Sequence, residues 1–246
     1  MRIDLYEDMY KTEATHWWHK SKRRFVKQFI TTYAGKKNIT ILDIGCGTGK
    51  NMEELAQYGD VWGVDASDDA LSFCKKRGLT QIKKGMVEHL PFKKDVFNVV
   101  CALDILEHVD DCVVIKEIKR VLKDDGYVVI TVPAFSWLWS KWDEILHHKR
   151  RYTKKSLKAV LEKEGLFIRR NTYIYFFLTI PLFIIRKLKQ LWSSPYSSDF
   201  QMNNDIINKI LFTLSELEQQ WINRYDMPFG TSVLCIAQKK PQKSLL

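Results

Sequence analysis

The sequence predicts an α/β fold: a seven-stranded, mostly parallel sheet with helices on both faces. Three observations support this prediction. Short apolar or β-branched runs alternate with helical patterns along the 246-residue chain, as they do in β-α-β units. A hydrophobic fraction of 46% is enough to fill a large core. The first run ends in the glycine-rich stretch DIGCGTGKN, and a strand that enters such a turn typically binds a ligand.

The N-terminal segment, 1–33, precedes the first strand. Its Trp18, Phe25 and Phe29 recur at near-helical spacing, which predicts a helix laid on the sheet's edge or over its ligand. Helical patterns also separate the later strands. The seven runs that we expect to form strands are Thr40–Ile44, Val61–Val64, Gln81–Lys84, Val96–Ala102, Tyr127–Val132, Leu166–Ile174 and Ser232–Gln238.

The segment between the sixth and seventh runs departs from this alternation. It contains an apolar helix ending in RKLK, a Ser/Pro-rich break SSPYSSD, and an amphipathic helix with Asn203 or Asn204 as its cap. That last helix places one apolar stripe on its surface: Ile206, Ile210, Leu214, Leu217 and Trp221. We therefore expect an insertion that covers or docks something.

The whole chain, 1–246, is expected to form a single domain. Its parts are an N-terminal helical cap 1–35, a cofactor-binding core 36–172, a helical insertion or lid 173–228, a final strand 229–240 and a tail 241–246.

Composition limits the partners and the location. The net charge of +10, from 39 basic and 29 acidic residues, suggests an anionic partner such as a phosphorylated substrate, nucleic acid or a membrane surface, although basic proteins without one are common. Five scattered cysteines without a Cys-x-x-Cys pair fit a reducing cytoplasm and predict no metal site. Met1–Tyr10 lacks the apolar core of a signal peptide. Tyr173–Ile185 is shorter than the roughly 20 residues of a spanning helix.

The glycine-rich turn fits two common nucleotide motifs poorly. A triphosphate-binding loop needs Gly where Ile44 stands, and Ser or Thr where Asn51 stands. A dinucleotide fingerprint needs its third Gly where Lys50 stands, although Gly49 is one residue early. Both motifs bind phosphates, so the failures favour another ligand.

The carboxylates near the turn favour a cationic ligand. Asp43 would repel a pyrophosphate and attract a cation such as the sulfonium and ammonium of S-adenosylmethionine, or it caps its own turn as a solvated strand-end residue. Asp65 ends the run VWGVD, where a carboxylate accepts both ribose hydroxyls of either NAD or S-adenosylmethionine.

Several stretches between residues 39 and 165 together resemble the class I S-adenosylmethionine-dependent methyltransferases, especially the small-molecule groups called type 11 and type 12. The stretches are ILDIGCGTG, Asp65, LPF, ALDILEHVDD and IKRVLKDDGYVVITVP. The resemblance implies a Rossmann-like sheet whose last strand, within GTSVLCIAQK, is antiparallel. It also implies the following cofactor-binding residues: Tyr10, Trp18, Arg23, Asp43, Gly45, Cys46, Gly47, Asn51, Asp65, Ala66, Met86, Val87, Glu88, Leu103, Asp104 and His108.

Two of these assignments need comment. The resembling family commonly has Asp at the position of Met86, so we expect Met86 to pack on the adenine while Val87 or Glu88 supplies the polar contact. In EATHWWHKSKRR, an aromatic residue and Arg23 are expected to close over the methionine end of the cofactor, with Arg23 on its carboxylate. The alternative is a surface helix anchored by Trp17 and Trp18.

The acceptor is expected to contact the stretch after the fifth strand. Trp137, Trp139 and Trp142 could form flat walls, His147 or His148 could take a proton with Tyr152 beside them, and Arg150 and Arg151 could hold a phosphate or carboxylate. In the alternative interpretation the tryptophans are core, the His pair is a loop and KRR is a solvated face.

The residues after the fourth strand, LDIL, lack the prolines of enzymes that methylate base amino groups, and no loop Cys-Pro nucleophile is present, which disfavours nucleic acid.

These observations predict a cytoplasmic S-adenosylmethionine-dependent methyltransferase that acts on an oxygen or ring nitrogen of a small, acidic or aromatic acceptor. One alternative is a peripheral-membrane methyltransferase of a lipid-linked or quinone-like precursor, which contacts the membrane through 173–192. That segment could equally be a lid or a dimer surface. Another alternative is a cofactor-binding interaction protein without catalysis.

Overall fold

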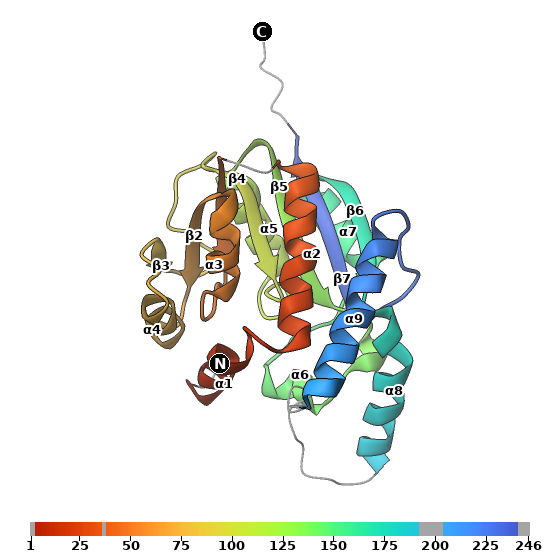
Figure 1. Cartoon of the computed structure of the whole chain (residues 1–246). Helices are drawn as coiled ribbons and strands as arrows, with labels where there is room; N and C mark the ends of the chain where they lie inside the picture. The colour runs from red at the N-terminus through yellow and green to blue at the C-terminus, as the bar shows by residue number, and fades with distance from the viewer. Residues whose placement is uncertain (1–2, 36–37, 192–203, 241–246) are drawn as a thin grey trace.

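The computed structural model describes residues 3–35, 38–191 and 204–240, and it contains one sheet with helices packed on both faces (Figure 1). The strands lie in the order β3-β2-β1-β4-β5-β7-β6, and β7 runs antiparallel to both neighbours. All seven expected strands are present: β1 Ile39–Ile44, β2 Gly59–Asp65, β3 Ile82–Lys84, β4 Phe97–Leu103, β5 Leu122–Pro133, β6 Leu166–Ile174 and β7 Ser232–Lys239. The predicted fold class and the antiparallel last strand are confirmed.

The helices begin where the local sequence provides caps. Side chains of Ser67, Asp110, Thr153 and Asn204 accept hydrogen bonds from the first turns of α4, α5, α7 and α9. The helical elements are α1 Ile3–Thr12, α2 Trp17–Tyr33, α3 Lys50–Leu55, η1 Ala56–Tyr58, α4 Asp68–Lys76, α5 Asp111–Val121, η2 Ser136–Leu138, α6 Lys141–Ile145, α7 Lys154–Lys163, α8 Phe176–Leu191 and α9 Asp205–Ile222.

Both faces of the central strands are buried. In β4, Val100 and Ala102 face a core shared with α5 and α7, whereas Val99 and Cys101 face a core shared with α2, α3 and α4. A parallel strand covered on both faces carries a continuous apolar run, as this one does. These two cores hold the carboxyl ends of the parallel strands in fixed positions.

The N-terminal segment forms two helices rather than one. The pattern of Trp18, Phe25 and Phe29 belongs to α2, which packs with β5, α3 and α9 across the middle of one sheet face (Figure 1). Its start is fixed by Trp17, whose indole lies edge-on to Tyr175 with 5.6 Å between ring centroids. The amino end of α2 therefore reaches the carboxyl ends of the strands, and α1 lies beside it against α4.

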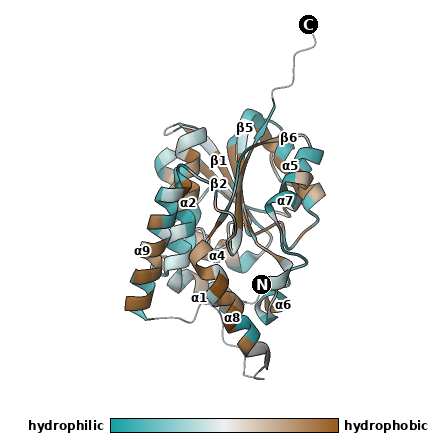
Figure 2. Ribbon diagram, turned by 90° about the vertical axis from the view of Figure 1, so that its right-hand side faces the viewer, coloured by the Kyte–Doolittle hydropathy of each residue, from teal (hydrophilic) through white to brown (hydrophobic). Residues whose placement is uncertain are grey.

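The structure shows which side of the insertion's last helix packs on the sheet layer and which side faces outward. Asn204 caps α9 as predicted, and the five stripe residues do share one face, but that face is exposed: Ile206 is 71% exposed and Trp221 56%. The helix packs on α2 through its other side, which buries Ser215, Glu218, Gln219 and Ile222. The buried side thus mixes three polar side chains with Ile222, Leu211 and Phe212, and the most apolar stripe faces outward (Figure 2).

The preceding helix, α8, also exposes apolar side chains: Ile180, Ile184, Ile185 and Leu188. Among the described residues no helix is both long and apolar enough to cross a membrane. The Ser/Pro-rich break, the alternative cap Asn203, and the tail 241–246 lie outside the described residues.

Candidate active site

The carboxyl ends of β3, β2, β1 and β4 meet at one edge of the sheet, and the strand order reverses between β1 and β4. Open parallel sheets bind ligands at such a switch point. The predicted cofactor residues of the core come from this edge: Asp43, Gly45, Cys46, Gly47 and Asn51 from β1 and its turn, Asp65 and Ala66 from the end of β2, Met86, Val87 and Glu88 after β3, and Leu103, Asp104 and His108 at and after the end of β4.

The turn after β1 has a conformation that depends on glycine. Gly45, Gly47 and Gly49 have φ angles of 65°, 55° and 85°, in the left-handed region. A Cβ on Gly45 would lie 2.1 Å from Cδ1 of Ile105, and a Cβ on Gly47 would lie 2.8 Å from Cε of Met9. The turn is therefore closely covered by the loop after β4 and by α1, and side chains there would push both away.

Asp65 connects this turn to the next loop. Its Oδ2 accepts a hydrogen bond from the backbone N–H of Gly47 at 2.9 Å, and its Oδ1 accepts one from Ser67 at 2.9 Å. A carboxylate offers about four acceptor positions, so two remain for other donors such as ribose hydroxyls.

Asp43 is buried at the end of β1 without a basic partner among the interactions described. Burial, with the neighbouring Asp65 and Glu13 carboxylates, raises the pKa of Asp43 to about 7. A side-chain hydrogen bond from Asn51 opposes this rise. A buried acid that has a neutral amide but no cation beside it, next to a glycine turn, fits a ligand that brings a positive charge.

The N-terminal helices cover the turn through charged side chains. Glu13 is buried and accepts hydrogen bonds from the hydroxyl of Thr48 and from Arg77, the latter at 2.5 Å. Arg77 also donates to the carbonyl of Thr48 at 2.8 Å and stacks on Tyr10, with its guanidinium carbon 4.3 Å from the ring centroid. The Tyr10 ring packs on Phe73 of α4, with 5.0 Å between centroids.

The basic residues of α2 have different partners from those predicted. Arg23 is buried and donates to Glu54 at 2.6 Å, so its guanidinium is engaged by α3. Lys22 is the cation that reaches the strand ends: it pairs with Asp104, and its ammonium lies 3.3 Å from the Trp18 ring centroid. Burial lowers the pKa of Lys22, while Asp104 opposes that change.

Glu107, His108 and His148 converge beside this pair. One potential ligand atom from each lies within 4.8 Å of the others. Glu107 is fully buried, and both of its carboxylate oxygens lack a hydrogen-bond partner. Burial, reinforced by Asp104, raises the pKa of Glu107 well above its usual range. Burial and His148 lower the pKa of His108 to about 4, against Asp104 and the His147 carbonyl.

Behind His148 lies a second buried acid, Asp143. Its Oδ1 is 2.8 Å from Nδ1 of His148 and accepts from Arg151 Nε at 2.8 Å, while its Oδ2 accepts from a second Arg151 nitrogen at 3.0 Å. The hydrogen bonds from His148 and Arg151 hold the pKa of Asp143 well below its usual range despite burial. This arrangement fixes the His148 ring and leaves Nε2 as its other nitrogen.

Comparison with known proteins agrees with this geometry. A family model described as a methyltransferase domain matches residues 42–130, which run from β1 through β5. Over this segment the chain is a methyltransferase domain of the S-adenosylmethionine-dependent kind.

The chain is also similar to three individual proteins. The ubiquinone biosynthesis O-methyltransferase of Hydrogenovibrio crunogenus is 29% identical over 66% of this chain and 80% of its own. The methyltransferase in a Haloferax volcanii complex with the Trm112 activator has a TM-score of 0.63 at 16% identity, over 98% of this chain and 95% of its own. The Haemonchus contortus phosphoethanolamine N-methyltransferase 2, solved with S-adenosylmethionine, has a TM-score of 0.58 at 19% identity, over 87% of this chain and 52% of its own.

Within this methyltransferase, the predicted acceptor residues separate into different environments. Tyr152 is buried and donates from its hydroxyl to Asp111 at 2.8 Å and to the Leu106 carbonyl at 3.1 Å. Burial and Asp111 raise its pKa. Arg150 pairs with Asp111 at 3.0 Å. These contacts link the loop to α5, whereas the predicted roles in catalysis or anion binding would require groups facing an acceptor.

The two histidines of the pair also separate. His148 joins Glu107 and His108, whereas His147 is exposed with φ of 58°. Of the three tryptophans, Trp137 is 49% exposed and stacks on Phe135, with 5.1 Å between centroids. Trp139 and Trp142 are half-buried.

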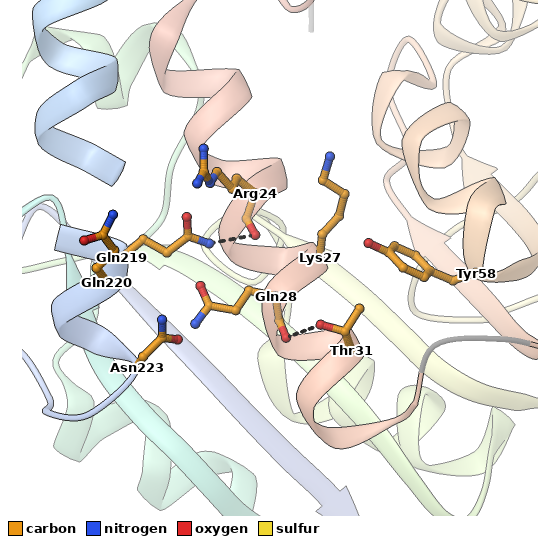
Figure 3. A pocket seen from close by; sticks show the side chains of 8 residues that line it. All are labelled: Arg24, Lys27, Gln28, Thr31, Tyr58, Gln219, Gln220 and Asn223. Atoms are coloured by element: carbon orange, nitrogen blue, oxygen red, sulfur yellow. Dashed lines mark hydrogen bonds between the residues drawn. The ribbon is translucent and has the colours of Figure 1, made fainter. Parts of the chain in front are cut away.

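The groove of Figure 3 lies away from these groups. It measures about 360 Å³ and is lined by Arg24, Lys27, Gln28, Thr31, Tyr58, Gln219, Gln220 and Asn223. Tyr58 immediately precedes β2, so this groove is near the amino ends of the strands, opposite the switch point. It is a polar hollow between α2 and α9 rather than the cofactor site.

Sequence reasoning missed four buried charged residues at the site: Glu13, Lys22, Glu107 and Asp143. For Glu107 the dipeptide Glu-His after β4 was an available signal, since it lay within the quoted stretch ALDILEHVDD. The partners of Glu13 and Lys22 come from distant segments, so spacing alone could not reveal them. The partners of Asp143, His148 and Arg151, lie within eight residues of it, so a local signal was available there too.

Proposed function

We propose that this enzyme transfers the methyl group of S-adenosylmethionine to an oxygen or ring nitrogen of a small-molecule acceptor, with a hydroxyl oxygen favoured. The observation that carries the proposal is that two chemically different sets of residues lie side by side at the carboxyl ends of the strands. The buried Asp43 and the glycine turn suit the cationic cofactor, and the Glu107–His108–His148 cluster after β4 suits the acceptor.

Methyl transfer is an in-line displacement, so the chain mainly has to align two reactants and exclude water. In this proposal Asp65 accepts the ribose hydroxyls and Met86, 58% exposed, packs on the adenine. Lys22 and Asp104 separate the cofactor side from the acceptor side. The resemblance to a ubiquinone biosynthesis O-methyltransferase supports a hydroxyl acceptor.

The test is product formation. The purified protein is incubated with S-adenosylmethionine and matched acceptors: catechols and phenols in one set, imidazoles and secondary amines in the other. We expect S-adenosylhomocysteine release, and a product heavier by one methylene, with hydroxyl acceptors. Release only with the nitrogen acceptors would overturn the oxygen assignment, and tight cofactor binding without turnover in either set would favour the non-catalytic alternative.

A second candidate function, contact with an anionic lipid surface, is favoured by a specific observation. The outward faces of α8 and α9 expose Ile184 and Leu217 among other large apolar side chains, and Lys187 is exposed beside them on α8. With a net charge of +10, such a face suits a membrane interface that brings a lipid-linked or quinone-like acceptor to the enzyme.

Sedimentation with vesicles tests this contact. We expect binding to vesicles that contain phosphatidylglycerol and weak binding to phosphatidylcholine alone. The double variant Ile184→Glu/Leu217→Glu should lose binding, whereas Val113→Glu, at a 41% exposed position on α5, should keep it. A wild-type protein that stays in the supernatant but dimerises through these helices would instead identify them as a subunit interface.

A further inference from the structure

On the acceptor side, the carboxylate of Glu107 is the feature that still lacks a structural explanation. It is fully buried, and both oxygens lack a hydrogen-bond partner. Buried polar groups almost always have partners, so two unsatisfied oxygens on one buried acid require an explanation. The nearest potential ligand atoms belong to His108 and His148, within 4.8 Å.

The two histidines are oriented as metal ligands usually are. A ligating imidazole typically gives its second ring nitrogen to a carboxylate or a backbone carbonyl, which fixes its tautomer. Nδ1 of His148 lies 2.8 Å from the Asp143 carboxylate, and Arg151 holds that carboxylate from the other side. His108 has the carbonyl of His147 as its hydrogen-bond acceptor. Each ring therefore has one nitrogen left for a ligand.

The spacing of the three groups suits one ion. Imidazole and carboxylate ligands lie about 2.1 Å from a divalent cation, so ligands on opposite sides of an ion are roughly 4.2 Å apart. Ligand atoms within 4.8 Å of one another need only small side-chain rotations to reach it. The His108 and His148 rings are edge-to-face with centroids 4.8 Å apart. They therefore do not stack face to face, and they leave the position between the three groups open to an ion.

We propose that Glu107, His108 and His148 bind a divalent transition-metal cation beside the acceptor. Two imidazoles and one carboxylate favour Mn²⁺, Fe²⁺, Co²⁺ or Zn²⁺ over Ca²⁺ and Mg²⁺, which prefer oxygen ligands. Three protein ligands leave coordination positions open for a substrate oxygen.

The chemical role of the cation rests on the proposed function, whereas its binding does not. An acceptor hydroxyl on the cation has a lowered pKa and releases its proton to solvent. The oxygen then forms a bond to the methyl carbon while the carbon–sulfur bond breaks. The electron pair of that bond stays on sulfur, which yields the methyl ether and S-adenosylhomocysteine.

The test is Co²⁺ titration of the full chain, followed by visible absorption, with bound metal counted by mass spectrometry. We expect one Co²⁺ per chain and d–d bands typical of nitrogen and oxygen ligands. Glu107→Gln and His148→Gln should each weaken binding at least about tenfold, and Asp143→Asn should weaken it by about 10- to 100-fold through His148. His89→Gln changes an exposed histidine elsewhere and should bind Co²⁺ as the wild type does.

The variants are compared only after circular dichroism and S-adenosylmethionine affinity show that they fold. Glu107→Gln keeps the side-chain shape and replaces one carboxylate oxygen that would bind the metal, so it should retain cofactor affinity. Equal Co²⁺ binding by wild type and Glu107→Gln, or no stoichiometric binding by wild type, would overturn the site. Because no acceptor or turnover is involved, either result leaves the methyl-transfer proposal to its own test.

Discussion

At the scale of single residues, the cofactor edge carries more negative charge than its immediate partners neutralise. Glu13 has Arg77, and Asp104 has Lys22, but Asp43 has no such cation among the described interactions. A cationic cofactor would supply the missing positive charge. The edge therefore favours S-adenosylmethionine over a cofactor with a pyrophosphate, a distinction that the glycines alone do not make.

The first prediction concerns pH. Because the pKa of Asp43 is raised to about 7, the carboxyl is largely protonated below that pH when no cofactor is bound. The cofactor prefers the ionised form, so binding at lower pH must first remove a proton. We expect S-adenosylmethionine affinity, measured by calorimetry between pH 5.5 and 7.5, to fall by up to about tenfold per pH unit below 7.

The matched variant is Asp43→Asn, which keeps shape and removes the ionisation. It should bind more weakly at pH 7.5 and show a flat profile across the same range. A wild-type affinity that does not change with pH would contradict the assignment of Asp43 as the partner of the cofactor's positive charge.

The second prediction concerns the ribose contact. Asp65→Ala removes two acceptors that the ribose would use, so affinity for S-adenosylmethionine should fall by roughly 1.5 to 3 kcal/mol, the range for hydrogen bonds to charged groups. The control is Asp60→Ala, an exposed acid near the start of the same strand, which should leave affinity unchanged. Equal calorimetric affinity of Asp65→Ala and wild type would rule out the ribose role.

At the scale of elements, α8 and α9 are joined by one buried carboxylate. Glu218 of α9 accepts hydrogen bonds from the backbone N–H groups of Tyr175 at 2.5 Å and Phe176 at 3.0 Å, where α8 begins. The first N–H groups of a helix lack intrahelical partners, so this acid satisfies donors of a neighbouring helix. This contact holds the start of α8, and farther along the helix Arg186 donates to the carbonyl of Leu138.

The third prediction follows from it. Glu218→Ala leaves buried N–H groups unpaired and should lower the free energy of unfolding by about 1 to 3 kcal/mol, measured by urea denaturation. Glu216→Ala, two residues earlier on the same helix, removes a more exposed pair with Arg24 and should cost under about 1 kcal/mol. Similar losses in both variants would show that Glu218 does not fix the start of α8.

At the scale of the whole molecule, the predictable features were the local ones. Short apolar or β-branched runs identified all seven strands, and Asn204 identified the start of α9, because both signals depend on neighbouring residues. The orientation of α9 was not predictable. Its apolar stripe indicated a helix that covers or docks something, but not which side packs on α2. There Gln219 donates to the Arg24 carbonyl, and the stripe faces outward.

The same distinction applies to the site. The glycine turn and Asp65 are contiguous with strand ends, so spacing located them. The partners of Arg23, Arg151 and Tyr152 are Glu54, Asp143 and Asp111, which are set by tertiary packing. The sequence did not indicate these internal partners, and the ligand-binding roles of the three side chains stay predictions.

The last prediction concerns coupling between the cofactor and the N-terminal helices. Because α1 lies against the turn through Met9 and Glu13, a ligand held by that turn should stabilise α1 together with the core. At a cofactor concentration 100 times its dissociation constant, the stabilisation is about 2.7 kcal/mol, and for a chain of this size it should raise the melting temperature by roughly 5 to 10 °C.

S-adenosylmethionine should also slow tryptic cleavage after Lys11, at the end of α1, more than cleavage after Lys187 on the exposed face of α8. In Asp43→Asn both effects should diminish together. A melting shift without protection at Lys11 would show that α1 does not cover the bound cofactor.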